Sequence, residues 1–224
     1  ETTPLDLDMT ARIKDGDGDD KATAVVDLGP YELTFDPPDP VIVGWEVLTS
    51  HEGVGEIACP MTDGYVEPRQ GGLAKVRVTF NHRIVPDEQM YLSMISINGV
   101  AHGDLSDLSD NGTWDETGTM VTFTFSEPLP DQDTYIISLS RYLWSSWGKP
   151  LSGDRDIEVH VLVGNVSGDD NDVDNGDMVK VRNHRDEPLT AGNARYDVNR
   201  NGAINNGDII AVRNRRGNCC PAGL

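Results

Sequence analysis

Residues 41–163 alternate between apolar and polar positions with a period of two. The alternation is clearest in 74–80, where Ala74, Val76, Val78 and Phe80 are interleaved with polar residues. It recurs in 121–125, 135–139 and 157–163, and further candidates lie at 41–49, 54–59 and 90–97. Such a period places one face of a strand in a core and the other in water. We therefore expect a mainly β protein in which six or seven short strands form an antiparallel β-sandwich.

Turn-forming and proline-rich residues divide the chain. The sequences Asn98-Gly99, Asp110-Asn111-Gly112 and Pro128-Leu129-Pro130 separate the strand candidates. A proline-rich segment at 35–40 precedes them, and the period shifts to short helical patterns after about residue 164. The predicted regions are an N-terminal remnant of an upstream β-rich domain (1–38), the sandwich (39–163), a small helical domain (164–218) and a C-terminal tail (219–224).

The composition narrows the range of partners. The net charge is −20, from 38 acidic and 18 basic residues, so the chain repels nucleic acids and anionic membranes. No apolar run approaches the ~18 residues of a membrane span, so we expect no membrane insertion. The acidic excess suits a protein that holds divalent cations, although it is equally compatible with simple solubility.

The strongest sequence signal is an internal repeat. The segment 175–183, Asn-Gly-Asp-Met-Val-Lys-Val-Arg-Asn, recurs 31 positions later at 206–214 as Asn-Gly-Asp-Ile-Ile-Ala-Val-Arg-Asn. Six of the nine positions are identical. Each copy is predicted to begin a short helix, and each is preceded by spaced side chains that carry oxygen.

The second repeat has the spacing of an EF-hand loop. Calcium prefers six to eight oxygen ligands, which the twelve-residue loop supplies from positions 1, 3, 5, 7, 9 and 12, with glycine at 6. Gly202 lies at position 6, and position 7 contributes only its backbone carbonyl. The predicted ligands are Asp197, Asn199, Asn201, Ala203, Asn205 and Asp208. An Asn/Asp-rich turn without metal is the alternative, but such a turn does not require this spacing twice.

The first repeat is less regular. With Asp177 at position 12, the loop fits only if one residue is inserted near 170–171, and the glycine at position 6 is lost. We therefore expect weaker calcium binding here, and two calcium ions in all. The predicted ligands are Asn165, Ser167, Asp169, Asp172, Asp174 and Asp177.

Residues 164–218 resemble a type I dockerin on these loops and the helices that follow them. The resemblance implies two calcium loops, each followed by one helix, with 187–195 as the connector. It also implies a cohesin-like protein partner, which contacts loop positions 10 and 11. Those positions are Asn175-Gly176 and Asn206-Gly207, and their identity allows two binding orientations related by a pseudo-twofold axis. Dockerins often carry hydroxyl residues there, and this chain does not.

Two further resemblances concern the rest of the chain. Residues 41–163 are similar to bacterial immunoglobulin-like domains that precede dockerins in large secreted proteins. Residues 7–32 resemble the closing turn of exported parallel β-helix proteins. Within that segment Asp15, Asp17 and Asp19 lack a carboxylate at the twelfth position, so we interpret them as a solvated acidic turn. We expect a fragment of a larger protein, located outside a bacterial cell or on its surface.

We find no sequence signature of an enzyme. No nucleophile elbow, phosphate loop or zinc motif is present. The five histidines are interpreted as isolated surface or packing residues, with His160 on the polar face of the last strand. The odd cysteine count allows at most one disulfide, which would join Cys59 to Cys219 or Cys220 in an oxidising compartment.

The leading hypothesis is therefore a non-catalytic, calcium-stabilised attachment module with an immunoglobulin-like spacer. It would dock to a cohesin-like or other surface protein, or onto its own β-sandwich. One alternative is a carbohydrate-binding sandwich in which Trp144 and Trp147 stack on sugar rings, although these residues could equally pack a loop or cover the domain junction. A second alternative is a structural protein of a surface layer or matrix.

Overall fold

The computed structural model describes residues 13–14, 25–26, 37–85, 94–168 and 171–221. The chain divides into two compact units, Glu1–Pro38 and Asp39–Leu224. In the first unit, β1 (Ile13–Lys14) and β2 (Val25–Val26) form an antiparallel pair. The predicted acidic turn at Asp15, Asp17 and Asp19 lies outside the described residues, as do positions 90–93.

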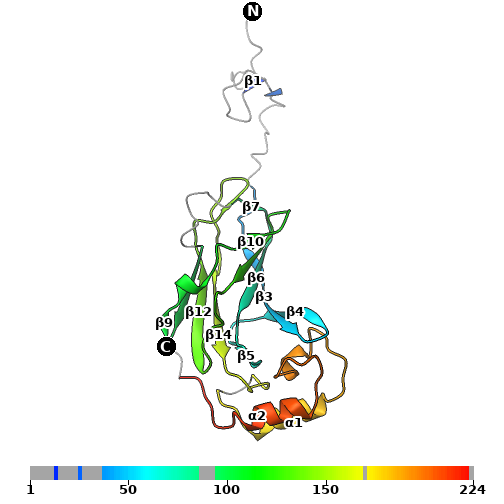
Figure 1. The fold of residues 1–224 in the computed structure, drawn as a ribbon. Helices are drawn as coiled ribbons and strands as arrows, with labels where there is room; N and C mark the ends of the chain where they lie inside the picture. Colours follow the sequence, from blue (N-terminus) through cyan, green and yellow to red (C-terminus); the bar gives the residue numbers. More distant parts are fainter. Residues whose placement is uncertain (1–12, 15–24, 27–36, 86–93, 169–170, 222–224) are drawn as a thin grey trace, which may run out of the picture. The chain divides into compact units, whose positions relative to one another are not determined.

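Two five-stranded sheets make up most of the second unit (Figure 1). Nearly all neighbouring strands are antiparallel, and β5 runs parallel to β14. A short antiparallel pair, β7 (Ile84–Val85) and β13 (Trp144–Ser145), lies beyond the sheets. The first sheet contains β10 (Thr113–Trp114), β11 (Met120–Thr124), β6 (Lys75–Phe80), β3 (Ile42–His51) and β4 (Gly55–Met61), in that order. The second contains β5 (Tyr65–Glu67), β14 (Asp156–Val161), β12 (Asp133–Leu139), β8 (Ile95–Gly99) and β9 (Gly103–Asp104).

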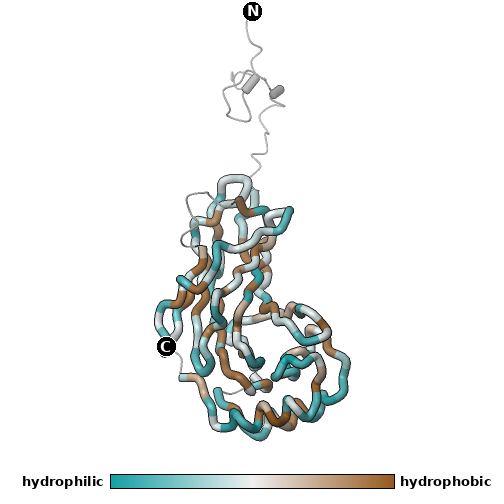
Figure 2. Tube along the Cα trace, viewed as in Figure 1, coloured by the Kyte–Doolittle hydropathy of each residue, from teal (hydrophilic) through white to brown (hydrophobic). Residues whose placement is uncertain are grey.

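One hydrophobic core joins the two sheets. Val76, Val78 and Phe123 from the first sheet belong to the same buried cluster as Ile137 and Val159 from the second. Along β6 every second residue is buried, and the alternation of hydropathy is visible along the strands (Figure 2). The mainly β, antiparallel architecture predicted from the sequence is thus confirmed. We call residues 39–163 the β-domain.

Two short helices follow the sheets. These are α1 (Asn175–Asn183) and α2 (Asn206–Arg213), which contact each other, and a 3-10 turn, η2 (Ala194–Tyr196), lies in the connector between them. We call residues 164–218 the loop–helix module. None of the helices in the described part of the chain is long and apolar enough to cross a membrane.

The module shares buried surface with the β-domain. Its core includes Val173, Val212 and Ile204, and Val66 and Leu162 of the β-domain pack in the same cluster. Module residue Ala194, in η2, is buried in the core of the β-domain itself. Since burial of apolar surface is the main favourable term in such contacts, the module is held firmly on one end of the sheets.

The segment Asn98-Gly99 forms the end of β8, and the sequence-based expectation of a turn there is wrong. These residues pair with Asp104 and Gly103, so the chain reverses at 100–102. Asp133 explains the shift, because its buried carboxylate accepts hydrogen bonds from the backbone amides of Ala101 and His102 at 2.9 and 3.0 Å. The His102 ring lies 2.8 Å from the same carboxylate.

Replacing Asp133 with asparagine is expected to destabilise the β-domain by about 2–4 kcal/mol at neutral pH, because an amide cannot satisfy all the donors around it. Burial pushes the pKa of Asp133 up, but hydrogen bonds from Ala101, His102 and Thr134 outweigh burial and leave the pKa below its ordinary value. Asp133 therefore contributes its full stabilisation at pH values above the ordinary pKa of aspartate. This stabilisation is lost as the pH falls through the lowered pKa of the folded state. Urea unfolding at pH 7 and pH 3 tests this, with exposed Asp107→Asn as the control. An equal midpoint for Asp133→Asn and Asp107→Asn would contradict it.

All three cysteines are free thiols, so the disulfide considered from the sequence does not form. Cys59 is buried and accepts a hydrogen bond from Arg69 at 3.4 Å. Cys220 is buried in the core of the loop–helix module, where its thiol donates to the Asp133 carbonyl at 3.4 Å. Burial raises the pKa of the Cys220 thiol to about 12, so it is a packing residue. The predicted C-terminal tail, 219–224, therefore begins with two residues that pack on the module: Cys219 forms a β-bridge with Asp172, and Cys220 lies in the module core.

Candidate metal-binding loops

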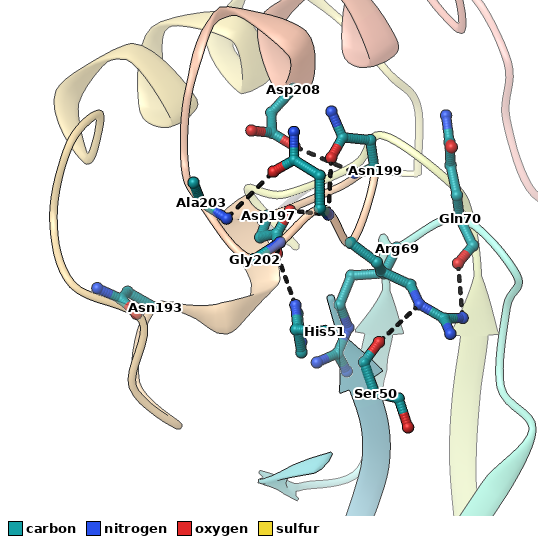
Figure 3. A network of polar contacts seen from close by, with 12 residues as sticks. Ser50, His51, Arg69, Gln70, Asn193, Asp197, Asn199, Gly202, Ala203 and Asp208 are labelled. Carbon is teal, nitrogen blue, oxygen red and sulfur yellow. Dashed lines mark hydrogen bonds and ion pairs between the residues drawn. The ribbon is translucent and has the colours of Figure 1, made fainter. Parts of the chain in front are cut away.

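Asp197 anchors the second loop. Its carboxylate is fully buried and accepts the backbone amides of Asn201 at 3.1 Å and Gly202 at 2.9 Å. These bonds fold the chain around position 1, and Gly202 has a φ of +83°, which glycine adopts without strain. Asn199 accepts a further hydrogen bond from the Asn201 amide at 3.0 Å (Figure 3).

Asp208 closes the same loop from the first turn of α2. Its two oxygens accept the amides of Asn199 at 3.0 Å and Asn205 at 2.8 Å, which joins position 12 to positions 3 and 9. Burial raises the pKa of Asp208; the Asn205 and Asn199 amides partly offset that effect, and the charge of nearby Asp197 raises the pKa further. Two buried carboxylates thus repel each other in the absence of a cation.

Two further predicted ligands of the second loop lie beside Asn205. The Asn205 amide group donates to the Asn201 side-chain oxygen at 3.3 Å and to the Ala203 carbonyl at 3.0 Å, so both oxygens lie close to the same side chain. Asn205 Oδ1 instead caps α2 through the Gly207 amide at 2.6 Å. Hard oxygen donors of mixed carboxylate, amide and carbonyl type are what calcium prefers, so the residues present fit calcium.

The second loop relies on few acidic groups. Among the described residues, no three His, Cys, Asp or Glu side chains meet at one place. Asp197 and Asp208 are the carboxylates of this loop, and its remaining predicted ligands are amide or carbonyl oxygens. A modest ligand charge favours moderate rather than extreme calcium affinity.

The first loop repeats part of this geometry. Asp177 is fully buried, and its oxygens accept the amides of Ser167 at 2.8 Å and Asp174 at 2.9 Å, which are the counterparts of the two bonds to Asp208. The buried Asn165 oxygen accepts the Ser167 hydroxyl at 3.0 Å and the Gly168 amide at 2.9 Å.

The remaining predicted ligands of the first loop are not gathered in the same way. Asp169 lies outside the described residues. Asp172 is exposed and forms a β-bridge with Cys219, and Asp174 is exposed and caps α1. The structure therefore brings Asn165, Ser167 and Asp177 together, Asp174 caps α1 beside Asp177 as Asn205 caps α2, and Asp172 has its partner elsewhere.

The two halves of the module exchange matching hydrogen bonds. The Asp186 amide, just after α1, donates to the Ile204 carbonyl at 2.9 Å, and the Gly217 amide, just after α2, donates to the Val173 carbonyl at 2.9 Å. Asp186 and Gly217 have φ values of +66° and +83°, so the turn that follows each helix contains a left-handed residue. Each loop is thereby tied to the end of the other helix.

Docking onto the β-sandwich was one of the predicted possibilities, but sequence analysis missed the residues that join the second loop to the β-domain. His51, at the end of β3, is fully buried, and its Nδ1 lies 2.7 Å from Asp197 Oδ2 (Figure 3). Arg200, within the second loop, donates from its side chain to the carbonyls of Ser50 and Gln70, each at 3.0 Å. His51 and Asp197 are 146 positions apart in the chain, and no local pattern marks the pair.

The other histidines also have specific neighbours, so they are not isolated, although these contacts are those of surface or packing residues. His102 contacts Asp133, as described above. His160, predicted on a polar face, is buried and lies 2.9 Å from the Thr134 hydroxyl. His184 lies 2.9 Å from Glu187, and the His82 ring packs 4.9 Å from the ring of Trp147.

The predicted partner positions lie at the starts of the helices. Asn175, Gly176 and Asn206 are exposed, and Gly207 is half-buried. Two apolar residues accompany them, Val179 on α1 and Ile210 on α2, with 45% and 48% of their surfaces exposed. These two positions are separated by the same 31 residues as the repeats, so each helix presents an equivalent apolar residue.

The two tryptophans considered for sugar binding are on the surface. Trp144 and Trp147 are 39% and 48% exposed. Trp144 belongs to β13, and its partner strand β7 lies at the end of the β-domain away from α1 and α2 (Figure 1). The tryptophans therefore do not cover the junction with the loop–helix module.

Comparisons with known proteins give little guidance. No family model and no curated protein matches the chain. Among solved structures, the crystal structure of the S-layer protein rSbsC(31-844) has 17% identity and a TM-score of 0.37, over 56% of this chain and 14% of that chain. The N-terminal part of the bacterial S-layer protein SbsC has 16% identity and a TM-score of 0.36, over 56% and 24% of the two chains. At these TM-scores the similarity supports no conclusion about fold or function.

Proposed function

We propose that residues 164–218 form a dockerin-like attachment module, ordered by two calcium ions and carried by an immunoglobulin-like β-domain that acts as a non-catalytic spacer. We place it outside a bacterial cell or on its surface. The observation that carries the proposal is the second loop, where Asp197 and Asp208 are both buried and the oxygens of Asn201 and Ala203 lie close together beside Asn205. Calcium would neutralise the two carboxylates and complete this ligand set.

The duplicated helices supply the docking surface in this proposal. Val179 and Ile210 are exposed at equivalent positions, and the equivalent arginines Arg182 and Arg213 are exposed beside them. Exposed apolar residues next to arginine are typical of protein interfaces. We infer a cohesin-like or other surface protein as the partner, and the identity of Asn175-Gly176 and Asn206-Gly207 allows it to bind in either of two orientations.

Affinity capture from a bacterial cell-surface extract tests this function. We expect the chain to retain a protein partner in calcium and to release it in chelator. Replacing Val179 and Ile210 together with aspartate should reduce retention by at least tenfold. The control is Val43→Asp, at an exposed valine of the β-domain, which should leave capture unchanged. Equal retention with and without calcium, or by the double variant, would contradict the proposal.

A carbohydrate-binding β-domain is the second candidate, because Trp144 and Trp147 are exposed on the side of the β-domain away from the helices. Exposed flat aromatic rings can stack on sugars. In the same capture experiment, retention on polysaccharide that is independent of calcium and lost in Trp144→Ala or Trp147→Ala would favour this candidate. A structural role in a surface layer would instead give calcium-dependent binding of the chain to copies of itself.

A further inference from the structure

We propose that the β-domain completes the second calcium loop, with His51 as a positioning residue for Asp197, so that calcium binding fastens the module to the β-domain. This inference rests on the proposed calcium function. It adds that the second loop is a shared element of two domains rather than a self-contained site.

His51 holds one oxygen of the position-1 ligand. An ionised carboxylate only accepts hydrogen bonds, so facing it His51 uses Nδ1–H as the donor of a hydrogen bond to Asp197 Oδ2, with 2.7 Å between the two atoms. The same oxygen also accepts the Gly202 amide, whereas Oδ1 accepts the Asn201 amide alone. Oδ1 is therefore the oxygen with more capacity left for a cation.

The contact with Asp197 is the main polar interaction of His51, because the His51 side chain is shielded from water. The side chain is fully buried, and no described residue hydrogen-bonds to Nε2. Burying the unpaired Nε2 of His51 costs free energy, and the hydrogen bond between Nδ1 and Asp197 offsets that cost. If Asp197 moved away, His51 would lose that compensation as well, and the two groups therefore favour the same arrangement.

Backbone hydrogen bonds also hold the second loop against the β-domain, at the β3–β4 hairpin that contains His51 and at Gln70. The Glu52 amide donates to the Arg200 carbonyl at 2.9 Å, and the Gln70 amide donates to the Val198 carbonyl at 2.7 Å. The Cα of Gly202 approaches so closely that a Cβ there would lie 2.0 Å from the Glu52 carbonyl oxygen. Positions 1 to 6 of the loop are thus shaped by the β3–β4 hairpin and by the chain near Gln70.

The first loop differs at the equivalent position. It has Asn165 where the second has Asp197, and the Asn165 oxygen accepts from Ser167 and Gly168 of its own loop. Coupling between calcium and the β-domain is therefore expected at the second loop. Because coupling between two binding events is reciprocal, the β-domain raises calcium affinity by the same factor by which calcium tightens the contact between the domains.

Calcium titration of the full chain tests the role of His51. In an Asp177→Asn background, which disables the first loop, His51→Gln should lower the calcium affinity of the second loop by about 10- to 100-fold, the range typical of groups that orient metal ligands. The control is His160→Gln, a buried histidine that contacts Thr134 and Glu158 of the β-domain, and it should change the affinity less than twofold. Unchanged affinity in His51→Gln would overturn the inference while leaving the calcium function intact.

Hydrogen exchange on the unmutated chain provides a measurement that does not depend on the variant folding. Chelation should speed exchange of the Glu52 and Gln70 amides at least tenfold, while the central amides of Val76 and Val78 stay protected. If calcium binds but exchange at Glu52 and Gln70 does not change, the coupling is absent. If calcium does not bind the chain at all, the proposed function fails and this inference with it.

Discussion

Removal of calcium is expected to lower the melting temperature of the chain by on the order of 5–10 °C for each calcium site. This magnitude applies when the free calcium concentration before removal is about a hundred times the Kd of the site. The reason is electrostatic. Asp197 and Asp208 are buried in one loop, and the raised pKa of Asp208 reflects its burial and the charge of Asp197. A bound cation converts this repulsion into attraction, so ligand binding to the native state stabilises it.

Thermal unfolding followed by circular dichroism in calcium, chelator and restored calcium measures this effect. Magnesium at the same concentration is the control for ionic strength, because it demands octahedral geometry and loses its water reluctantly. We expect calcium, but not magnesium, to restore the full melting temperature. The same melting temperature in chelator and in calcium would contradict the expectation.

Replacing Gly202 with alanine is expected to cost about 3 kcal/mol or more and to separate the module from the β-domain. An L-residue in the left-handed region costs about 1–2 kcal/mol by itself. The added Cβ would also lie 2.0 Å from the Glu52 carbonyl oxygen, so the loop and the hairpin cannot keep their present distance. The contacts of Arg200 with Ser50 and Gln70 would then be lost as well.

Gly53→Ala provides a matched control in the facing hairpin. Gly53 has a φ of +68°, close to the +83° of Gly202, but an added Cβ there meets nothing within 4 Å. It should therefore show only the backbone cost of about 1–2 kcal/mol. Urea unfolding of both variants in saturating calcium gives the comparison, and equal losses would show that the close approach of the loop to the hairpin does not contribute.

The longer strands were predictable because burial follows the period of two. In β6 the residues Val76, Val78 and Phe80 are buried in strict alternation. Strands of two or three residues, such as β5, β9 and β10, have too few positions to show a period. His160 was misplaced because alternation fails where both faces are covered: it lies between buried Val159 and Val161, just before Leu162 enters the module core.

The two loops could be predicted from the sequence because the residues that form each of them are local. Asp197 and Asp208 belong to one short segment, and the spacing between them is set by loop geometry. The contribution of the β-domain was not readable, because His51 and Arg200 act across domains through contacts that leave no spacing pattern. The role of Asn205 was also only partly foreseen, since its oxygen caps α2 while its amide group faces Asn201 and Ala203.

Isothermal titration of the chelator-treated full chain with calcium measures whether residues 164–218 hold two calcium ions. We expect two bound ions in the unmutated chain, and one in either Asp208→Asn or Asp177→Asn. The matched variants remove position 12 of the second and first loop respectively, and both residues are buried at equivalent positions of the repeat. Absence of calcium binding, or a stoichiometry unchanged in Asp208→Asn, would contradict this expectation.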